Sequence, residues 1–461
     1  MFFLLFPVQR AIIWSVLAGY LLLPVRTEFN LPGIPSMDKT TIPSLCALIF
    51  ALVMAGRSTW KIPRSTTAML LIAMYVLVPF LTGWNNQEPL ILGDLVIPGM
   101  RPYDWFSAAA TRFLYILPFV IGIGALADER SQATLIKAFV VAALVYTLPI
   151  LWELRMSPQL HVKLYGFFPH EFQQMVRDGG YRPVVFLGHG LLVSTFIMMA
   201  CLAAISMWRQ KLRLEFLPAS LAVLYLAVIL VLCKSFGAIL ICIAMAGIFI
   251  TFSQRSAVRL LVVIALLIVA YPSLRGANLF PTSGISTLAH NVSPARASSL
   301  DFRFKNEDML LNKARQKPFF GWGTWGRNSM MMSEDGQHVR RGVTDGQWII
   351  EFGSFGWIGY ISSFGLLCLP FVLAFRKRRT AEWTPSSVTL LFMLLANLID
   401  LIPNSSLTPL TWLIAGSLCG SLLRKPEYPR SLQTAPIARS SAGPAETSAV
   451  GLLEPRQSIL K

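Results

Sequence analysis

The chain has few charged residues and no cysteine pattern. Charged residues make up 14% of its 461 residues and hydrophobic residues 54%, whereas a soluble domain carries roughly 25% charged residues. We therefore expect a protein that is embedded in lipid. None of the cysteines has CxxC or Cys/His spacing, which argues against a disulfide framework or a zinc site and indicates small core residues instead. They are Cys46, Cys201, Cys233, Cys242, Cys368 and Cys419.

The signatures of soluble nucleotide and hydrolytic enzymes are also missing. The chain contains no P-loop, no GxGxxG between strand and helix, no HExxH and no GxSxG. Its five histidines are scattered without metal-ligand spacing, so we expect neither a metal nor a cofactor. The formal net charge of +17 is typical of basic cytoplasmic loops in a membrane protein and does not require a nucleic-acid partner.

The sequence contains about twelve apolar runs that are long enough to cross a bilayer. A helix that spans a bilayer needs about 17 to 25 residues. This pattern predicts an all-α integral membrane protein whose polytopic domain covers residues 1–425. The tail, residues 426–461, is rich in Pro, Ser and Ala and is expected to be disordered. The runs lie at about 8–25, 42–56, 66–83, 106–127, 132–152, 184–208, 215–233, 236–252, 257–273, 347–375, 387–403 and 408–424.

Basic residues in the short loops predict the orientation. If the twelve runs alternate in direction, all of these residues fall on one side, so both termini are expected in the cytoplasm. Four longer loops then face outward, at about 26–41, 84–105, 153–183 and 274–346. The largest, 274–346 between the ninth and tenth runs, is itself basic, which an anionic ligand outside would explain. The short-loop residues are Arg57, Lys61, Arg64, Arg130, Lys137, Arg209, Lys211, Arg213, Arg255, Arg259, Arg376-Lys377-Arg378-Arg379 and Arg424-Lys425.

The largest loop carries the most distinctive stretch, Lys317-Pro-Phe-Phe-Gly-Trp-Gly-Thr-Trp-Gly-Arg327. It is polar, basic and punctuated by glycine, and it leads into Asp345 and the tenth apolar run. Functional residues gather on loops that a rigid scaffold holds, so we expect the work of the protein to take place here. Asp345 has two interpretations: it caps the following helix, or it activates an acceptor hydroxyl as a general base.

Two arginines are further candidates. Arg182, in Gly179-Gly-Tyr-Arg-Pro183, is either an interfacial anchor with its head in water or a fork that holds a phosphate in bidentate fashion. Arg303 opens an expected amphipathic helix, 301–314, with Met309, Leu310 and Ala314 on its apolar side. It belongs either to a solvated face or to a site. Glu307 on the same helix is either a dipole partner or an acid near a sugar.

Three ionisable residues interrupt apolar runs or lie inside them. Lys234 marks a tight outward turn, where a lysine either extends to the interface or contacts a substrate. Arg112 and Asp400 lie within predicted spans, where ionisable groups are costly and often functional. Both are near the outer ends of their runs, which weakens the functional interpretation.

In their order along the chain, these motifs resemble the O-antigen polymerase and O-antigen ligase superfamily of bacterial polysaccharide enzymes. In that family an Arg opens the helix of the large periplasmic loop. A Pro-x-x-Gly-x-Gly element, a His-Asn or Asp-Asn pair, and an apolar run broken by glycines follow. The matching residues here are Arg303, Pro318-Phe-Phe-Gly-Trp-Gly323, Asp345-Gly346, Gly356 and Gly359, with Arg182-Pro183 matching a second family arginine and Lys234-Ser-Phe-Gly237 a Ser-Arg-Gly-like element.

The resemblance covers about residues 180 to 424, and the first 150 residues match in hydropathy only. The ligase branch has His where this chain has Asp345, and the companion Asn is Gly346. This departure favours the exopolysaccharide polymerase branch over ligation to lipid A core, and it leaves the identity of the base open.

The resemblance implies an inverting membrane glycosyltransferase of the GT-C type in the bacterial inner membrane, which uses undecaprenyl-diphosphate-linked oligosaccharides and no metal. Arg182 and Arg303 would hold the donor diphosphate, and Asp345 would orient or deprotonate the acceptor hydroxyl. A chain-length regulator and a flippase are the protein partners that it suggests. The residues expected to bind substrate are Lys234, Glu307, Arg327, Trp322 and Trp348, although interfacial aromatic residues are more often belt residues.

Three functions compete. The favoured one is a polysaccharide polymerase that joins lipid-linked repeat units at the periplasmic face. A ligase that transfers the glycan to lipid A core or to a protein uses the same chemistry. A non-enzymatic flippase or exporter belongs to another class, but carriers place polar groups along a path near the midplane. This chain concentrates its polar residues in one outer loop and at the ends of its spans.

Overall fold

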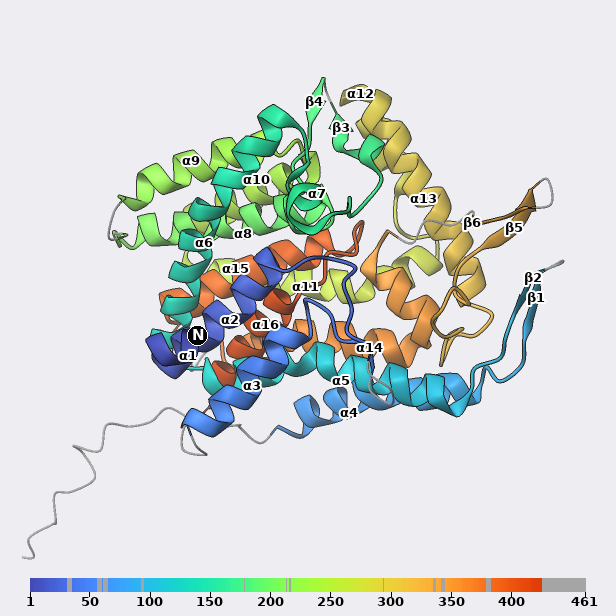
Figure 1. Cartoon of the computed structure of the whole chain (residues 1–461). Helices are drawn as coiled ribbons and strands as arrows, with labels where there is room; N and C mark the ends of the chain where they lie inside the picture. Colours follow the sequence, from blue (N-terminus) through green and yellow to red (C-terminus); the bar gives the residue numbers. More distant parts are fainter. Residues whose placement is uncertain are drawn as a thin grey trace, which may run out of the picture. The chain divides into compact units, whose positions relative to one another are not determined.

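The computed structural model is mostly helical (Figure 1). It describes residues 1–30, 35–55, 60, 65–92, 95–177, 179–212, 214, 217–292, 294–334, 337–340, 345–378 and 383–424, which belong to one compact unit, Met1–Arg424. The predicted tail, 426–461, and the predicted cytoplasmic residues Arg57, Lys61, Arg64, Arg213, Arg379 and Lys425 lie outside the described residues.

Each apolar run found in the sequence forms a helix, which confirms the prediction of an all-α, multi-pass membrane protein. Six helices are long and apolar enough to cross a membrane: α4 (Thr66–Trp84), α5 (Pro102–Ala125), α6 (Glu129–Met156), α8 (Gly190–Arg209), α11 (Gln254–Gly276) and α14 (Gln347–Arg376). Shorter apolar helices account for the other runs: α2 (Val8–Leu22), α3 (Ile42–Ala55), α9 (Ala219–Leu232), α10 (Phe236–Thr251), α15 (Pro385–Asp400) and α16 (Pro409–Leu423).

The remaining elements are short or belong to loops. The helices are α1 (Phe2–Leu5), α7 (Leu160–Tyr165), α12 (Thr282–Val292) and α13 (Pro294–Ala314), with a 3-10 turn at Phe172–Met175. Three antiparallel hairpins pair β1 (Leu90–Leu92) with β2 (Leu95–Ile97), β3 (Val176–Arg177) with β4 (Gly180–Tyr181), and β5 (Met331–Glu334) with β6 (Gln337–Arg340).

Helix α13 corrects one expected boundary. It begins at Pro294, seven residues before the expected start at Asp301, because proline has the backbone angle that a first helical position requires and needs no amide partner there. Leu310 and Ala314 are buried as expected, and Met309 is half-buried. Arg303 therefore lies in the third turn of the helix and does not open it.

The sixth apolar run also begins later than expected, at Gly190 and not at residue 184. The buried carboxylate of Glu153 accepts hydrogen bonds from the amides of Val184 and Val185, at 2.8 and 2.7 Å, and from Leu160 at 3.1 Å. These amides are satisfied without a helical turn. The chain that follows Arg182 is thereby fixed as a non-helical segment beside α6.

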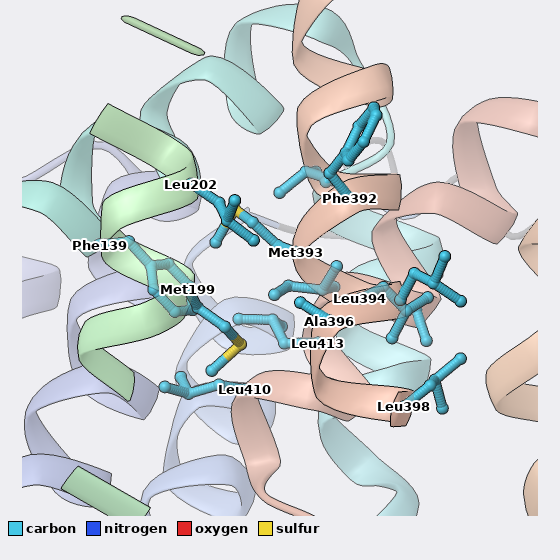
Figure 2. Close-up of a cluster of buried hydrophobic side chains, with 14 of the residues drawn as sticks. Phe139, Met199, Leu202, Phe392, Met393, Leu394, Ala396, Leu398, Leu410 and Leu413 are labelled. Carbon is cyan, nitrogen blue, oxygen red and sulfur yellow. The ribbon is translucent and has the colours of Figure 1, made fainter. Parts of the chain in front are cut away.

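Close helix packing fixes the direction of the helices. A Cβ added at Gly416 would lie 2.1 Å from the Phe119 carbonyl oxygen, and one at Gly420 would lie 2.6 Å from that of Ile123. Small residues allow such close approach between membrane helices, and the pairing shows that α5 and α16 run parallel. Their neighbours α8 and α15 run antiparallel, since Thr195 bonds Asp400 and Ser206 bonds Thr389. Figure 2 shows buried Phe139, Met199, Phe392 and Leu413, whose helices α6, α8, α15 and α16 share the core.

One end of the bundle carries the long loops. There, the amide of Gln347 at the start of α14 donates to Leu401 at the end of α15, at 3.0 Å. One turn further along α14, Glu351 pairs with Arg112, which lies in the middle of α5. The start of α8 reaches the same place through Thr195 and Asp400. We call this the loop-bearing end, and both groups of residues described below lie on it.

Candidate functional site

The Pro318–Gly323 motif packs against a kink in α14. The helix is interrupted at Gly356, where φ is 64° and ψ is −162°. The amides of Trp322 and Gly323 donate to the carbonyls of Gly353 and Ser354, both at 2.9 Å, and the Trp357 amide donates to Pro318 at 2.7 Å. The loop thus replaces the hydrogen bonds that a continuous helix would make.

Glycine is required at this junction by space and by backbone angle. A Cβ at Gly321 would lie 2.4 Å from the Ser354 carbonyl carbon, and one at Gly356 would lie 2.3 Å from that of Phe319. Both residues have positive φ, which side chains disfavour. The glycine pattern that carries much of the resemblance is therefore explained by a backbone-to-backbone contact and not by chemistry.

Arg327 braces the same loop. It is 2% exposed, and its guanidinium donates to the carbonyls of Pro98 at 2.8 Å, Glu88 at 3.0 Å and Trp322 at 3.2 Å. Burial lowers its pKa. Two of its donors bind the loop that carries β1 and β2 and the third binds Trp322 in its own loop, so Arg327 has a structural role. Substrate binding by this residue stays a prediction without a supporting contact.

Glu307 and Trp348 are enclosed in the same way. The Glu307 carboxylate accepts from Tyr271 Oη at 3.1 Å and from Trp348 Nε1 at 3.3 Å, and it lies 3.5 Å from Arg275 Nε. Burial raises the pKa of Glu307. The Trp348 ring is fully buried and offers no face on which a sugar could stack.

Trp322, the other tryptophan expected to bind substrate, is half-buried. Its Nε1 donates to the Lys313 carbonyl at 2.8 Å, and Lys317 Nζ lies 4.8 Å from its ring centroid. Both contacts tie the ring to the end of α13. As for Glu307 and Trp348, the contacts of Trp322 are internal to the protein, and its role in binding stays a prediction.

Arg182 differs from these residues. It follows the β3–β4 hairpin, is 2% exposed, and its side chain crosses the start of α8, where a Cβ at Gly190 would lie 2.6 Å from Arg182 Cδ. Its buried Nε has no hydrogen-bond partner among the described residues. The interfacial-anchor interpretation is wrong, because an anchor holds its head in water and this head is enclosed.

Positive charge gathers around Arg182. Burial, followed by the charge of Arg177, lowers the pKa of Arg182 to about 10, and Arg303 adds to the effect. Burial and then the charges of Arg182, His170, Arg177 and Arg303 lower the pKa of His189 to about 3. Since the N-terminus of α8 adds its own partial positive charge, this region favours an anion.

Lys234 contributes to the same region from the turn between α9 and α10. Its φ is 54°, and its Nζ donates to the Arg177 carbonyl at 2.8 Å. The lysine therefore holds the β3–β4 hairpin that leads to Arg182. We call Arg177, Arg182, Lys234 and Arg303, together with the neutral ring of His189 among them, the cationic cluster.

Arg303 and Asp345 meet at the edge of this cluster. Arg303 Nε lies 3.8 Å from Asp345 Oδ2, and Arg303 Nη1 donates to the Pro403 carbonyl at 3.0 Å and to Asn404 Oδ1 at 3.1 Å. The carboxylate of Asp345 is 38% exposed. Its capping interpretation is wrong, because Gly346 is the N-cap of α14 and no side chain caps that helix.

Gly346, the departure from the family pattern, also has a steric reason. A Cβ there would lie 2.3 Å from the Ile402 carbonyl oxygen. The neighbouring Gln347 amide donates to Leu401 and Asn404, at 3.0 and 3.3 Å. An asparagine at this position, as in the family that the sequence resembles, would require the junction of α14 with the end of α15 to shift.

A residue that the sequence reasoning missed, Asn404, orients Arg303. Its Nδ2 donates to Asp400 Oδ1 at 2.8 Å, and the other oxygen of Asp400 accepts from Thr195 and Ser406, both at 2.7 Å. The signal that could have found it was Asp400, an ionisable residue in an apolar run. Its buried carboxylate holds the amide that in turn holds Arg303.

No protein-family model matches this sequence, and no curated protein matches it. The geometry of the site therefore carries the functional argument. Among the residues described, no group of three or more His, Cys, Asp and Glu could hold a metal ion. The donor set of the cationic cluster fits an anion, and guanidinium groups suit phosphate oxygens in particular.

Proposed function

We propose that the protein is an inverting membrane glycosyltransferase of the O-antigen polymerase type, which lengthens polysaccharide from undecaprenyl-diphosphate-linked glycans. The single observation that carries the proposal is the buried guanidinium of Arg182, whose Nε lacks a partner among the described residues. It lies in the field of Arg303, whose Nε is 3.8 Å from Asp345 Oδ2. A buried cation without an acceptor is costly, and a diphosphate supplies the acceptors.

The cationic cluster suits the leaving group of this reaction. As the bond between the anomeric carbon and the diphosphate oxygen breaks, negative charge develops on the lipid diphosphate. Arg182 and Arg303 would stabilise that charge at fixed positions, and such preorganised electrostatic stabilisation is often the largest catalytic contribution. No metal is needed in this scheme, because the guanidinium groups neutralise the leaving group.

Asp345 suits the acceptor side. The acceptor hydroxyl attacks the anomeric carbon from the face opposite the diphosphate, and its proton passes to the Asp345 carboxylate. One glycosidic bond forms, one glycosyl–phosphate bond breaks, and configuration inverts. The ion pair with Arg303 would keep the carboxylate oriented and connect the base to the leaving-group site.

The proposed topology has twelve spans in a GT-C-type arrangement in the bacterial inner membrane, with both termini cytoplasmic and the 274–346 loop periplasmic. Alternating helix directions support it, as do basic residues at the other end of the bundle. There, Arg209 donates to Phe249 near the end of α10, and Lys377 Nζ donates to the Arg424 carbonyl at 3.2 Å. Such positive charge is typical of the cytoplasmic side.

The decisive experiment supplies purified protein in nanodiscs with undecaprenyl-diphosphate oligosaccharide as the only sugar donor. Glycans longer than the donor, resolved by gel and mass spectrometry, are the expected product. Products that appear only when lipid A core or a protein acceptor is added would identify a ligase. Transbilayer movement of the lipid-linked sugar in proteoliposomes without any transfer would identify a carrier and overturn the proposal.

Variants connect the activity to the site. Arg182→Met and Arg303→Met are expected to abolish chain growth while the protein still inserts and elutes as a single species. Arg155→Met is the matched control, because Arg155 is an exposed arginine at the end of α6. Normal chain lengths in both site variants would remove the proposed diphosphate site.

A further inference from the structure

A second site at the loop-bearing end is a cavity of about 510 Å³ that the cationic cluster does not use. Helices α4, α5, α14 and α16 line it, together with Ser36, Thr40, Thr324 and Trp325 from the loops. Its volume falls within the range of small-molecule sites, about 300–1,000 Å³. None of the residues that the sequence pattern assigned to substrate binding lines this cavity.

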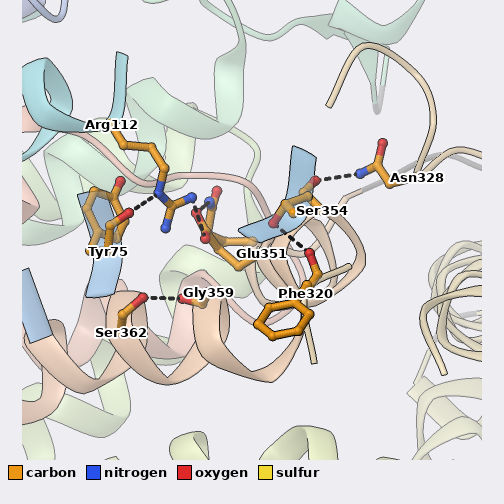
Figure 3. A network of polar contacts seen from close by, with 10 residues as sticks. Tyr75, Arg112, Phe320, Asn328, Glu351, Ser354, Gly359 and Ser362 are labelled. Atoms are coloured by element: carbon orange, nitrogen blue, oxygen red, sulfur yellow. Dashed lines mark hydrogen bonds and ion pairs between the residues drawn. The ribbon is translucent and has the colours of Figure 1, made fainter. Parts of the chain in front are cut away.

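A buried ion pair forms one wall of the cavity. Arg112 Nη1 lies 3.0 Å from Glu351 Oε2, and Arg112 Nε donates to the Tyr75 carbonyl at 2.7 Å (Figure 3). The guanidinium carbon lies 3.7 Å from the Tyr75 ring centroid and 4.2 Å from that of Phe355. Such packing fixes the guanidinium before any ligand arrives.

Two buried polar atoms in the cavity lining lack a hydrogen-bond partner among the described residues. Arg112 is 5% exposed, yet its Nη2 has no hydrogen-bond partner in the described part of the chain. Thr324 Oγ1 likewise has no hydrogen-bond partner among the described residues. Buried donors without acceptors are rare and call for an explanation. Both residues line the cavity, so a ligand there would lie beside these two atoms.

The lining indicates an uncharged ligand. Its two charged residues, Arg112 and Glu351, neutralise each other, and most of the other lining side chains are hydroxyls and aromatic rings. Hydroxyls exchange hydrogen bonds with a sugar, while an aromatic face packs against its C–H groups. The cationic cluster, with its surplus of positive charge, has the opposite character and suits a phosphate.

Trp325 is held at the rim in an unusual conformation. Its φ is 53°, a region that residues other than glycine rarely adopt, and its side chain is 57% exposed. Such strain persists where the surroundings enforce it and is often found at binding sites. Here the loop of residues 317–327, which is held against α14, enforces the conformation. The Trp325 indole therefore lies at the rim of a polar cavity.

The cavity and the cationic cluster share two chain segments. Gln347 and Thr408 line the cavity, while Asp345 and Asn404, a few residues away on the same segments, contact Arg303. The Gln347 amide joins the segments by donating to Leu401 and Asn404. The cavity and the contacts of Arg303 are therefore built on the same two segments of the chain.

We propose that this cavity binds an uncharged sugar residue, with Arg112, Thr324 and Trp325 as its contacts, and that it is the acceptor subsite. Binding follows from the lining alone, whereas the acceptor role rests on the proposed function. The diphosphate of the donor and the sugar of the acceptor would then occupy separate sites on either side of Asp345 in the reaction.

The test uses the oligosaccharide freed from its lipid diphosphate by mild acid, so that the probe carries no pyrophosphate. Calorimetry with protein in nanodiscs should detect binding, and Trp325→Ala and Thr324→Val should each weaken it at least tenfold. Both substitutions leave the Arg112–Glu351 pair in place, so folding is preserved. Arg182→Met should bind the probe as the wild type does. In the transfer assay, Trp325→Ala should raise KM for the acceptor and leave KM for the donor unchanged.

The outcomes separate the two proposals. Transfer by the wild type without binding of the free oligosaccharide would overturn the subsite and leave the function standing. Binding with the expected losses in Trp325→Ala and Thr324→Val, but without transfer, would support the sugar site and count against the proposed function. Displacement of the probe by inorganic pyrophosphate would show that the cavity is an anion site and would overturn the inference.

Discussion

Two arginines at the loop-bearing end, Arg182 and Arg327, are buried to the same degree and have opposite surroundings. Each is 2% exposed, and the sequence pattern assigned both to the substrate. Arg327 donates to three backbone carbonyls. Arg182 has a buried Nε without a partner among the described residues and lies among other positive charges. Burial alone therefore does not separate a structural arginine from a functional one.

The difference lies in how completely each group is satisfied. A buried charge is costly unless it is paired or hydrogen-bonded, so a satisfied arginine is explained by the fold and an unsatisfied one is not. The same comparison holds for the acids. Glu307 accepts from Tyr271 and Trp348, while Asp345 is more than a third exposed and has Arg303 nearby at 3.8 Å. Unused hydrogen-bonding capacity identifies the candidate site.

The largest expected effect tests this comparison with one substitution made twice. Arg182→Met should lower transfer about 10³-fold, the upper range for one electrostatic donor. Its melting temperature should be unchanged or raised, because the substitution removes a buried guanidinium whose Nε has no acceptor among the described residues. Arg327→Met should instead lower the melting temperature and leave the transfer rate nearly unchanged. It leaves three carbonyls without their donor and should cost about 3 kcal/mol of folding free energy. Its specific activity should remain near that of the wild type at low temperature.

Melting temperature and transfer rate, measured on the same preparations, decide the outcome. The comparison breaks down if Arg182→Met melts well below the wild type, or if well-folded Arg327→Met is as inactive as Arg182→Met. In the first case Arg182 would belong to the fold, and in the second Arg327 would belong to the site.

The second prediction concerns the carboxylate beside Arg303. Asp345→Asn keeps the shape of the side chain and removes the proton acceptor, so turnover should fall about 10²-fold, as for loss of a general base. Binding of the lipid-linked donor should change little, because Asp345 is not expected to contact the diphosphate. Single-turnover rates and donor binding separate these quantities. Equal losses in both would assign Asp345 to positioning of Arg303.

Much of the fold was predictable because it depends on local hydropathy. Runs of apolar residues give helices wherever lipid or a core covers them, and each predicted run is helical. The predicted helix starts at residues 184 and 301 were wrong. The true starts depend on a partner far along the chain in the first case and on the chemistry of one proline in the second. Glu153 lies 31 residues before Val184, whose amide it binds, and no local pattern reveals that pair.

The site was only partly predictable, for a related reason. Arg182, Arg303 and Asp345 were recognisable by motif order, and the structure brings Arg303 and Asp345 to 3.8 Å. The motifs could not distinguish them from Arg327 and Glu307 in the large loop or from Trp348 at the start of α14, which are enclosed by backbone and by neighbouring side chains. Satisfaction of hydrogen bonds depends on three-dimensional neighbours. Asn404 and the Arg112–Glu351 pair went unrecognised because their partners come from distant segments.

The third prediction tests whether the glycine pattern is structural. Gly356→Ala places a methyl group against Phe319 in a backbone conformation that is nearly exclusive to glycine, so it should cost about 2 kcal/mol of folding free energy. Gly247→Ala is the matched control, since a Cβ there meets nothing within 4 Å. Thermal unfolding in the same detergent measures both. Equal melting temperatures would contradict the proposed role of the loop-to-helix junction.

The smallest expected effect comes from His189 and sharpens the electrostatic side of the comparison. Its pKa is lowered to about 3 by burial and by the charges of Arg182, His170, Arg177 and Arg303, compared with about 6.5 when unfolded. The folded state therefore favours the neutral ring. This contribution is full above pH 6.5 and is lost as pH falls toward 3. At pH 5.5 the loss should be about 1 kcal/mol relative to pH 7.5.

His189→Asn isolates that contribution. Asparagine can still accept the hydrogen bond that the His189 ring receives from the Leu191 amide, so the start of α8 keeps its cap while the titrating group is removed. The variant should lose less stability than the wild type between pH 7.5 and 5.5. Inorganic pyrophosphate should reduce the acid sensitivity of the wild type, because an anion among the arginines makes protonation of His189 less costly. Identical pH profiles with and without pyrophosphate would argue that the cationic cluster does not bind phosphate. The lack of a partner for Arg182 Nε among the described residues would then need another explanation.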